Sequence, residues 1–381
     1  MKKFTKEATI ENVLESIKEN TYDRTKHIID FIEALDMIEG NMFISLDAKW
    51  GAGKTFYVRQ IEQTLNYLTR KAKCMDIEEN IEMAFSQNPL ANIKLDYTYL
   101  PVYYNAWLYD NHDDPLMSLI MIIVKECGVY CDTKLSPGSL SDKVASLLDF
   151  SLMTLNNFQF GGNFQSIKEK FQGRDILSLV KTTEEIREKV KEIFNDIINE
   201  NTDKLIIFID ELDRCKPSFA IEMLERIKHF FDDDRIIFIA SINRSQLVHT
   251  ISKYYGEKFD STGYLDKFFD RNVYLPEIDM RFNNVLQFPD TQYFLEHITE
   301  ELNNYYQLSL RENLRFYQCI SNVSKYSLIG DDVSGGIVLS AFVPIIIILN
   351  IKDEEIKNKF LCGDDSILDD LFQNIPSTLN N

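Results

Sequence analysis

The sequence contains few cysteines, and they are not arranged for metal binding. Six cysteines are scattered over 381 residues. Only Cys127 and Cys131 lie close together, and no second pair at the spacing of a zinc site accompanies them. The five histidines form no metal-ligand pattern either. We therefore expect reduced thiols in the core or on the surface, and no metal that is held by cysteine or histidine.

Long apolar runs are also scarce. Residues 1–7 (MKKFTKE) lack the apolar segment of a signal peptide, which predicts a cytoplasmic protein. The run at residues 116–124 falls far short of the roughly 20 residues that span a bilayer. The run at residues 336–349 is 14 residues long and contains Pro344. A run of this length is more typical of a buried helix than of a span, with docking to a membrane or a partner as the alternative.

Basic residues are outnumbered by acidic ones. The chain has 41 lysines and arginines against 60 aspartates and glutamates, which gives a formal net charge of −19. Such a chain repels phosphate backbones at long range, so general nucleic-acid binding is disfavoured. The densest basic cluster, residues 70–73 (RKAK), is equally typical of the exposed end of a helix, where cations complement the dipole. The acidic balance suits protein partners better.

The most informative stretch that is present is residues 47–55 (DAKWGAGKT), which follows the apolar run at residues 42–46. Between a strand and a helix, glycines let successive backbone N–H groups turn toward phosphate oxygens. Lys54 would reach the terminal phosphates, and the Thr55 hydroxyl would reach Mg²⁺. The apolar positions after Lys54 recur at spacings of three and four, as a helix requires. The strict motif begins with glycine, and Ala48 stands at that position.

A second half-site follows residues 205–209 (LIIFI), an apolar run typical of a strand that is buried on both faces of a parallel sheet. Asp210 ends this run and would hold Mg²⁺, while Glu211 would polarise an attacking water. A solvated acidic turn after a core strand is the alternative. Residues 235–243 predict a further strand. Asn243 at its end would sense the terminal phosphate, cap the following helix, or do both.

These motifs, in this order, resemble the KAP family of P-loop NTPases. The resemblance covers roughly residues 20–280 and is carried by WGAGKT at 50–55, YNAW at 104–107, IDELDRC at 209–215 and GYLDKF at 263–268. It implies an ATPase of the additional-strand class, with a catalytic acid beside the magnesium aspartate. Two positions depart from the family pattern. Ala48 replaces a glycine, and Glu211 replaces a frequent second aspartate but retains a base.

The expected fold is an α/β P-loop NTPase with a five-stranded parallel sheet flanked by helices. Its strands are predicted at residues 42–46, 99–104, 205–209, 235–243 and 272–275. Helical spacing predicts two short helices broken near residues 20–22, and a long helix over residues 175–200. We expect an ATPase core over residues 1–280, with an insertion at about 130–175, and a mainly helical lid and tail over residues 281–381.

The motifs and the resemblance together define the expected site. The residues expected to contact ATP are Trp50, Gly51, Ala52, Gly53, Lys54, Thr55, Phe56 and Asp210. Thr55 and Asp210 would share the Mg²⁺ ion. The expected catalytic residues are Lys54, Glu211, Asn243 and Arg271. Arg214 is expected in a local ion pair with Asp213 or Glu211.

Arg271 is predicted from its position alone. In oligomeric ATPases of the AAA+ class, an arginine before the last strand often reaches the phosphates of the neighbouring subunit, where it would stabilise developing charge. A surface arginine paired with Asp266 or Asp270 is the alternative. The segment before the first strand commonly lies over the base in such ATPases, which makes Tyr22 or Arg24 a candidate for contact with adenine.

We expect hydrolysis by direct attack of water, with the energy driving a change in lid position or in oligomeric state. Homo-oligomers or protein partners fit this expectation. Three alternatives stay open. The first is a nucleotide-gated scaffold with little turnover, which Ala48 favours. The second is a small-molecule kinase, for which Arg311 and Arg315 are thin support, and the third is a membrane-docked signalling ATPase anchored by residues 336–349. The resemblance permits roles in signalling complexes and in bacterial defence against phage.

Overall fold

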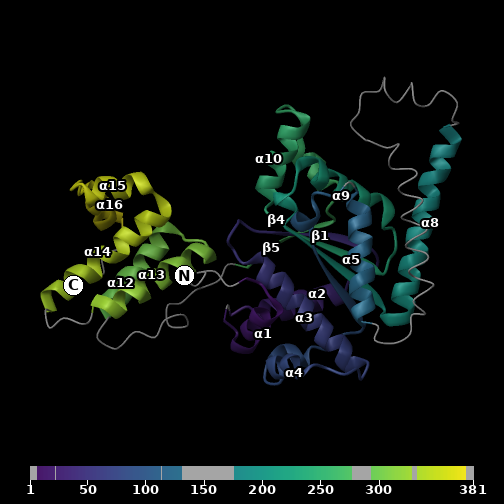
Figure 1. Ribbon diagram of the computed structural model, residues 1–381, viewed down its shortest axis with the longest axis horizontal. Helices are drawn as coiled ribbons and strands as arrows, with labels where there is room; N and C mark the ends of the chain where they lie inside the picture. Colours follow the sequence, from purple (N-terminus) through teal and green to yellow (C-terminus); the bar gives the residue numbers. More distant parts are fainter. Residues whose placement is uncertain are drawn as a thin grey trace.

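The computed structural model describes residues 7–21, 23–112, 114–130, 176–276, 293–327 and 333–374. A sheet lies between two helical layers, and the C-terminal helices form a separate group (Figure 1). The five strands are β1 (Met42–Asp47), β2 (Tyr99–Asn105), β3 (Lys204–Asp210), β4 (Ile236–Ile242) and β5 (Arg271–Tyr274). All neighbouring pairs are parallel, in the order β2-β3-β4-β1-β5. The predicted five-stranded parallel sheet is therefore confirmed.

The sheet register brings the functional motifs to one edge. Asp210 of β3 lies opposite Asn105 of β2 and Ser241 of β4, and Ser241 lies opposite Leu46 of β1. Every residue of β3 and β4 is buried, because these apolar strands are covered on both faces. The carboxyl ends of β1 and β3 are thus level with each other and separated only by β4.

One face of the sheet is covered by helices from the N-terminal part of the chain. Thr9 caps the first of them by accepting a hydrogen bond from the Asn12 N–H at 3.3 Å. Asn20 ends the same helix in the left-handed conformation, with φ of 47°. This break separates the two short helices that the sequence predicts. The helices of this face are α1 (Ile10–Glu19), α2 (Thr25–Asp36), α3 (Lys54–Ala72) and α4 (Glu79–Phe85).

The second face is covered by helices that follow β2, β3 and β4. They are α5 (Pro115–Tyr130), α8 (Ile176–Asn201), α9 (Pro217–Phe230), α10 (Arg244–Tyr255) and α11 (Ser261–Asp266). The long helix expected over residues 175–200 is α8, and it buries Ile186, Val190, Ile193 and Ile197 at helical spacing. The insertion expected at about residues 130–175 lies almost wholly outside the described residues.

The C-terminal helices have a hydrophobic core of their own (Figure 1, yellow-green to yellow). In the part that is expected to be mainly helical, α12 begins at Tyr293, and Gln307 with φ of 46° separates it from the next helix. No helix in the described part of the chain is long and apolar enough to cross a membrane. The helices are α12 (Tyr293–Tyr306), α13 (Leu310–Ser327), α14 (Val333–Lys352), α15 (Glu354–Leu361) and α16 (Ser366–Asn374).

The apolar run near the C-terminus forms part of α14, with Pro344 inside the helix. Its residues Ile345, Ile348 and Leu349 are buried in the core of the C-terminal helices. A buried helix was the preferred interpretation of this run, and the packing agrees with it.

Candidate nucleotide-binding site

The glycine-rich motif forms a loop between β1 and α3, at the carboxyl edge of the sheet. The chain leaves the sheet at Ala48, whose N–H donates to the Ile242 carbonyl oxygen at 3.2 Å. Gly51 and Gly53 have φ angles of +81° and +84°, in the left-handed region that favours glycine. Gly53 directly precedes α3, and N–H groups at a helix N-terminus attract anions. The loop therefore has an anion-binding geometry, although alanine stands at position 48, where the strict motif has glycine.

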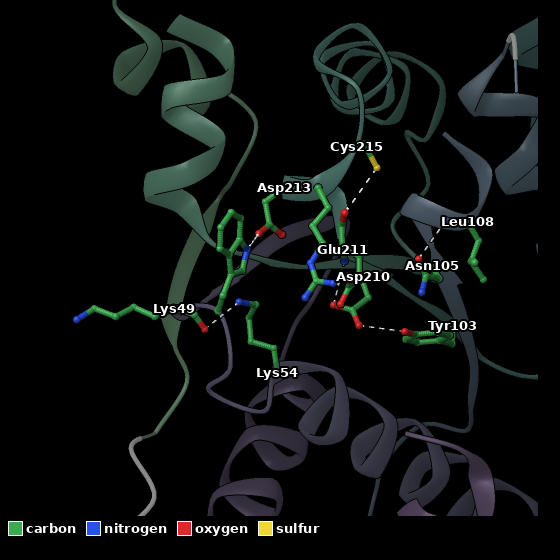
Figure 2. Close-up of polar contacts among 11 residues, drawn as sticks. Lys49, Lys54, Tyr103, Asn105, Leu108, Asp210, Glu211, Asp213 and Cys215 are labelled. Carbon is green, nitrogen blue, oxygen red and sulfur yellow. Dashed lines mark hydrogen bonds and ion pairs between the residues drawn. The ribbon is translucent and has the colours of Figure 1, made fainter. Parts of the chain in front are cut away.

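Lys54, the first residue of α3, lies over its own loop (Figure 2). Its Nζ donates to the Ala48 carbonyl oxygen at 2.6 Å. It also donates to the Lys49 carbonyl oxygen at 3.3 Å. Burial lowers the pKa of Lys54, and the charges of Asp213 and Asp210 oppose this shift. The ammonium group is thus held between loop carbonyls and carboxylates, beside the position that a phosphate would take.

Asp210 ends β3 with a carboxylate that is 1% exposed. One of its oxygens accepts the Tyr103 hydroxyl at 3.0 Å, and the other accepts the backbone N–H of Glu211 at 3.0 Å (Figure 2). Tyr103 belongs to β2, and its ring centre lies 4.4 Å from the Arg59 guanidinium. These contacts fix the Asp210 carboxylate at the edge of the sheet that carries the loop.

Glu211 follows β3 in an unusual backbone conformation. Its φ of +64° lies in the left-handed region, which residues with a side chain rarely adopt. Its carboxylate forms an ion pair with Arg214 at 2.6 Å, one of the two pairings that the sequence predicts. Burial raises the pKa of Glu211, and the neighbouring charge of Asp210 raises it further. A carboxylate with a raised pKa at this position is suited to accept a proton.

Both tryptophans of the chain lie at this edge of the sheet. The Trp50 indole N–H donates to the Asp213 carboxylate at 2.5 Å. The Trp107 ring centre lies 5.6 Å from the Arg214 guanidinium. Both indoles are about half exposed, at 47% and 51%. The turn that follows Glu211 is therefore in contact with both tryptophans.

The loop is also contacted from the N-terminal helices. Arg24, the residue before α2, donates to the Ala52 carbonyl oxygen at 2.9 Å and to the Gly53 carbonyl oxygen at 3.1 Å. Tyr22 and Arg24 are the two residues predicted to contact adenine. Tyr22 lies outside the described residues. Arg24 contacts the backbone of the loop, and its contact with adenine stays a prediction.

The first turn of α13 covers the loop from the C-terminal side. The Arg311 N–H donates to the Gly51 carbonyl oxygen at 3.0 Å. A Cβ atom added at Gly53 would lie 2.7 Å from Leu310 Cδ2, so the absence of a side chain at this position lets the helix approach. The C-terminal helices thus contact the glycine-rich loop directly.

These elements line a cavity of about 270 Å³. Its wall is made by Glu7, Ala8, Trp50, Gly51, Gly53, Lys54, Thr55, Phe56, Asp210, Glu211, Asp213, Arg214, Leu310, Arg311 and Leu314. All the residues expected to contact ATP are in this wall except Ala52. The sequence-distant Asp210 and the loop therefore meet in one cavity.

Thr55 and Asp210 offer hydroxyl and carboxylate oxygens to this cavity, which are the ligands that Mg²⁺ prefers. Among the described residues, no group of three or more histidines, cysteines, aspartates or glutamates could hold a metal ion. Mg²⁺ is usually held by one or two protein side chains together with phosphates and water. The donor set therefore fits Mg²⁺ bound with a nucleotide.

Asn243 is predicted to be catalytic but is not among the described residues that line the cavity. It follows β4, and its side-chain oxygen accepts the Gln246 N–H at 3.3 Å, which caps α10. The helix-capping interpretation therefore applies, and a contact with phosphate stays a prediction.

Arg271 begins β5, the edge strand of the sheet, and is exposed. The two carboxylates that were its alternative partners are engaged elsewhere. Asp266 forms an ion pair with Arg244 at 2.5 Å, and Asp270 forms one with Lys228 at 3.6 Å. A contact between Arg271 and a neighbouring subunit stays a prediction.

A family model described as the KAP family P-loop domain matches residues 23–326. This chain belongs to the KAP family. The KAP match covers the sheet, the helices on both of its faces except α1, α12 and nearly all of α13. It therefore runs past residue 280, where the sequence predicts the end of the ATPase core. The P-loop NTPase fold is shown by this match together with the parallel sheet.

Two further proteins are similar to this KAP chain. "Uncharacterized protein MJ0182" of Methanocaldococcus jannaschii is 29% identical over 163 residues, which cover 34% of this chain and 82% of that protein. Domain III of the Thermotoga maritima replication initiation protein DnaA matches with a TM-score of 0.34 and 13% identity, over 85% of this chain and 95% of that one. A TM-score at this level carries no argument about function.

Sequence reasoning missed the parts of the KAP site that lie outside the motifs. Leu310 and Leu314 carry no motif, and only the packing of α13 against the loop brings them to the cavity. Tyr103 directly precedes the YNAW motif, so strand alternation could have placed it on the same face of the sheet as α3. The sequence singles out Arg24 only as a candidate for contact with adenine, and it does not predict the contact with the loop, which depends on how α2 lies against the loop.

Proposed function

We propose that this KAP domain binds ATP with Mg²⁺ in the cavity beside the loop and hydrolyses it. The observation that carries the proposal is that Lys54 and Thr55 of the loop meet Asp210 and Glu211 of the β3 end in one cavity. Lys54 would contact the terminal phosphates, and Mg²⁺ held by Thr55 and Asp210 would neutralise phosphate charge. Glu211 would orient the attacking water and accept its proton.

The apolar part of the cavity is suited to a nucleobase. Ala8 and Phe56 come from the N-terminal part, and Leu310 and Leu314 come from α13. Ligand sites combine an apolar wall with a few polar groups that fix orientation. A base held by these four residues would place its phosphates at the glycine-rich loop, where the polar groups lie.

The excess of negative charge in the cavity wall favours an additional arginine from a second copy of the chain. The wall contains four carboxylates and three cationic side chains, namely Glu7, Asp210, Glu211 and Asp213 against Lys54, Arg214 and Arg311. A triphosphate adds further negative charge, which Mg²⁺ only partly offsets. Arg271 on the exposed edge strand would supply a cation to the site of a neighbouring subunit.

The output that we propose is a change of lid position or of oligomeric state. Gly51 and Gly53 of the loop contact Arg311 and Leu310 of the lid. Phosphate binding at the loop would therefore change the interaction between the loop and α13. A role in phage defence or in signalling complexes stays a prediction from the family resemblance.

A nucleotide-gated scaffold with little turnover is the second candidate. It is favoured by the ion pair between Glu211 and Arg214 at 2.6 Å, because a carboxylate that is held by an arginine is not available to a water molecule. Turnover would require this pair to open. A scaffold would bind ATP with Mg²⁺ in the same cavity and release phosphate very slowly.

The proposal is tested by phosphate release over a wide range of protein concentration. A trans arginine predicts that the rate per subunit rises with concentration and that Arg271→Ala and Glu211→Gln are each nearly inactive. Mixing these two variants should restore activity, because a mixed interface contains one site with both residues intact. Lys258→Ala removes another exposed cation and should leave the rate unchanged.

Two other results would redirect the proposal. A concentration-independent rate that Arg271→Ala does not change would show that each subunit hydrolyses ATP alone. Tight binding of ATP with Mg²⁺, together with a negligible rate in the wild type at every concentration, would favour the scaffold.

A further inference from the structure

The glycine-rich loop is held from behind by a buried arginine that belongs to none of the nucleotide motifs. The Arg24 side chain is 2% exposed. Its two terminal nitrogens donate to successive carbonyl oxygens of the loop, Ala52 at 2.9 Å and Gly53 at 3.1 Å. Its guanidinium also lies 5.4 Å from the centre of the Tyr57 ring. Arg24 is not among the described residues that line the cavity, so it reaches the loop from outside the cavity.

These two hydrogen bonds also fix the directions in which the following N–H groups of the loop point. In a planar trans peptide, the carbonyl of one residue and the N–H of the next point in opposite directions. Holding the Ala52 carbonyl therefore aims the Gly53 N–H away from Arg24, and holding the Gly53 carbonyl does the same for the Lys54 N–H. Gly53 and Lys54 both line the cavity, where a phosphate would accept these hydrogen bonds.

The chemistry of arginine suits this position better than that of lysine. Its planar guanidinium offers two N–H groups in a fixed fork, which can reach two successive carbonyl oxygens at once. A lysine has a compact ammonium that would reach one of them well. The buried positive charge behind the loop also favours an anion in front of it.

We propose that Arg24 is a positioning residue of the phosphate site, which orients the N–H groups of Gly53 and Lys54 toward a bound phosphate. This inference rests on the proposed function, since it assigns to Arg24 a part in binding the phosphates of the same nucleotide. Because Arg24 acts through the loop backbone, its removal should weaken the binding of phosphates and leave the binding of the base intact.

The test compares ligands that share the base and differ in their phosphates. Binding of ADP with Mg²⁺ is measured by calorimetry, and binding of adenosine is measured by ligand-observed NMR. The proteins are the wild type, Arg24→Lys, Arg24→Met and Arg235→Met. Arg235 is a matched control, because it is a partly buried arginine with an ion pair to Asp233 at the start of β4, away from the loop.

The proposal predicts that Arg24→Met weakens ADP binding at least about tenfold, which is the usual scale for charge-assisted hydrogen bonds, while adenosine binding changes less than twofold. Arg24→Lys should fall between this variant and the wild type, and Arg235→Met should change neither ligand. If Arg24→Met fails to fold, the ratio of the two affinities in Arg24→Lys decides in the same way.

Two results would overturn the inference, and they differ from each other. If the wild type binds ADP and the ratio of ADP to adenosine affinity is unchanged in the folded Arg24 variants, Arg24 does not position the loop. If the wild type binds neither ADP nor ATP, the proposed function itself fails and the inference fails with it.

Discussion

The buried carboxyl of Glu62 should make the stability of the P-loop domain fall as the pH rises from about 5 to 8. Glu62 lies on α3, where one of its carboxyl oxygens is 2.7 Å from the Arg59 guanidinium. Burial raises the pKa of Glu62 from 4.5 to about 7, and Arg59 only partly offsets this shift. The carboxyl is thus neutral in the folded protein at pH values at which it ionises in the unfolded chain.

The size and sign of the effect follow from this difference in pKa. Between about pH 4.5 and 7 the folded state binds the proton that the unfolded state releases, so the free energy of unfolding falls with rising pH. The rise of the pKa from 4.5 to about 7 corresponds to about 3 kcal/mol. The stabilising contribution is complete below about pH 4.5 and lost above about pH 7. Above that pH, Glu62→Gln should therefore gain stability relative to the wild type.

The assay is urea unfolding at pH 5 and pH 8, followed by tryptophan fluorescence. Both tryptophans lie at the edge of the sheet, so their signal reports on the core that contains α3. The difference in unfolding free energy between Glu62→Gln and the wild type should shift by about 2 to 3 kcal/mol in favour of the variant between these pH values. Glu188→Gln, on an exposed position of α8, is the control and should show no such shift.

A difference between Glu62→Gln and the wild type that is the same at both pH values would refute the reasoning. It would mean that the carboxyl of Glu62 has an ordinary pKa in the folded protein and that its burial has no energetic effect. A similar shift in Glu188→Gln would instead assign the effect to general charge.

Three further predictions concern the site. Binding of ADP with Mg²⁺ should change the intrinsic tryptophan emission, and Trp50→Phe should remove most of this change, because the Trp50 indole is bonded to the turn after Glu211; an undiminished signal would contradict this. Leu314→Ser should weaken ADP binding about tenfold, the effect of losing the apolar contact between a leucine and the base, and leave pyrophosphate binding unchanged in calorimetry. Gly53→Ala should lower the free energy of unfolding by about 1 to 2 kcal/mol, because of the positive φ at this position, and should weaken nucleotide binding. Adding Leu310→Ala should restore part of the affinity for nucleotide. If it restores none, the clash between the added methyl group and Leu310 is excluded as the cause.

Much of the fold could be predicted from the sequence, because its signals are local. The runs at residues 205–209 and 235–243 are apolar enough to be buried on both faces, so they indicate central strands of a parallel sheet. The break between α1 and α2 follows from Asn20, which tolerates the left-handed conformation. The positions of Lys54 and Asp210 in one cavity follow from the rule that parallel strands end at one edge.

The rest of the site depends on tertiary packing that no local pattern contains. Arg24 meets the loop only because α2 lies against it, and Leu310 meets Gly53 only because α13 folds back from the C-terminal helices. The side chain of Arg311 could be noted in the sequence, but the backbone hydrogen bond from its N–H to Gly51 could not. Such contacts link residues that are far apart in the chain, so periodicity and motif spacing do not reveal them.

The most direct test of the account measures ATP binding and phosphate release in the same samples of the wild type, Lys54→Ala and Glu211→Gln. The account predicts that Lys54→Ala loses both activities. Glu211→Gln should bind ATP with Mg²⁺ as the wild type does and release phosphate at least about 100-fold more slowly, as expected when a general base is removed. Hydrolysis by Glu211→Gln at the wild-type rate, or unchanged ATP binding by Lys54→Ala, would contradict the account.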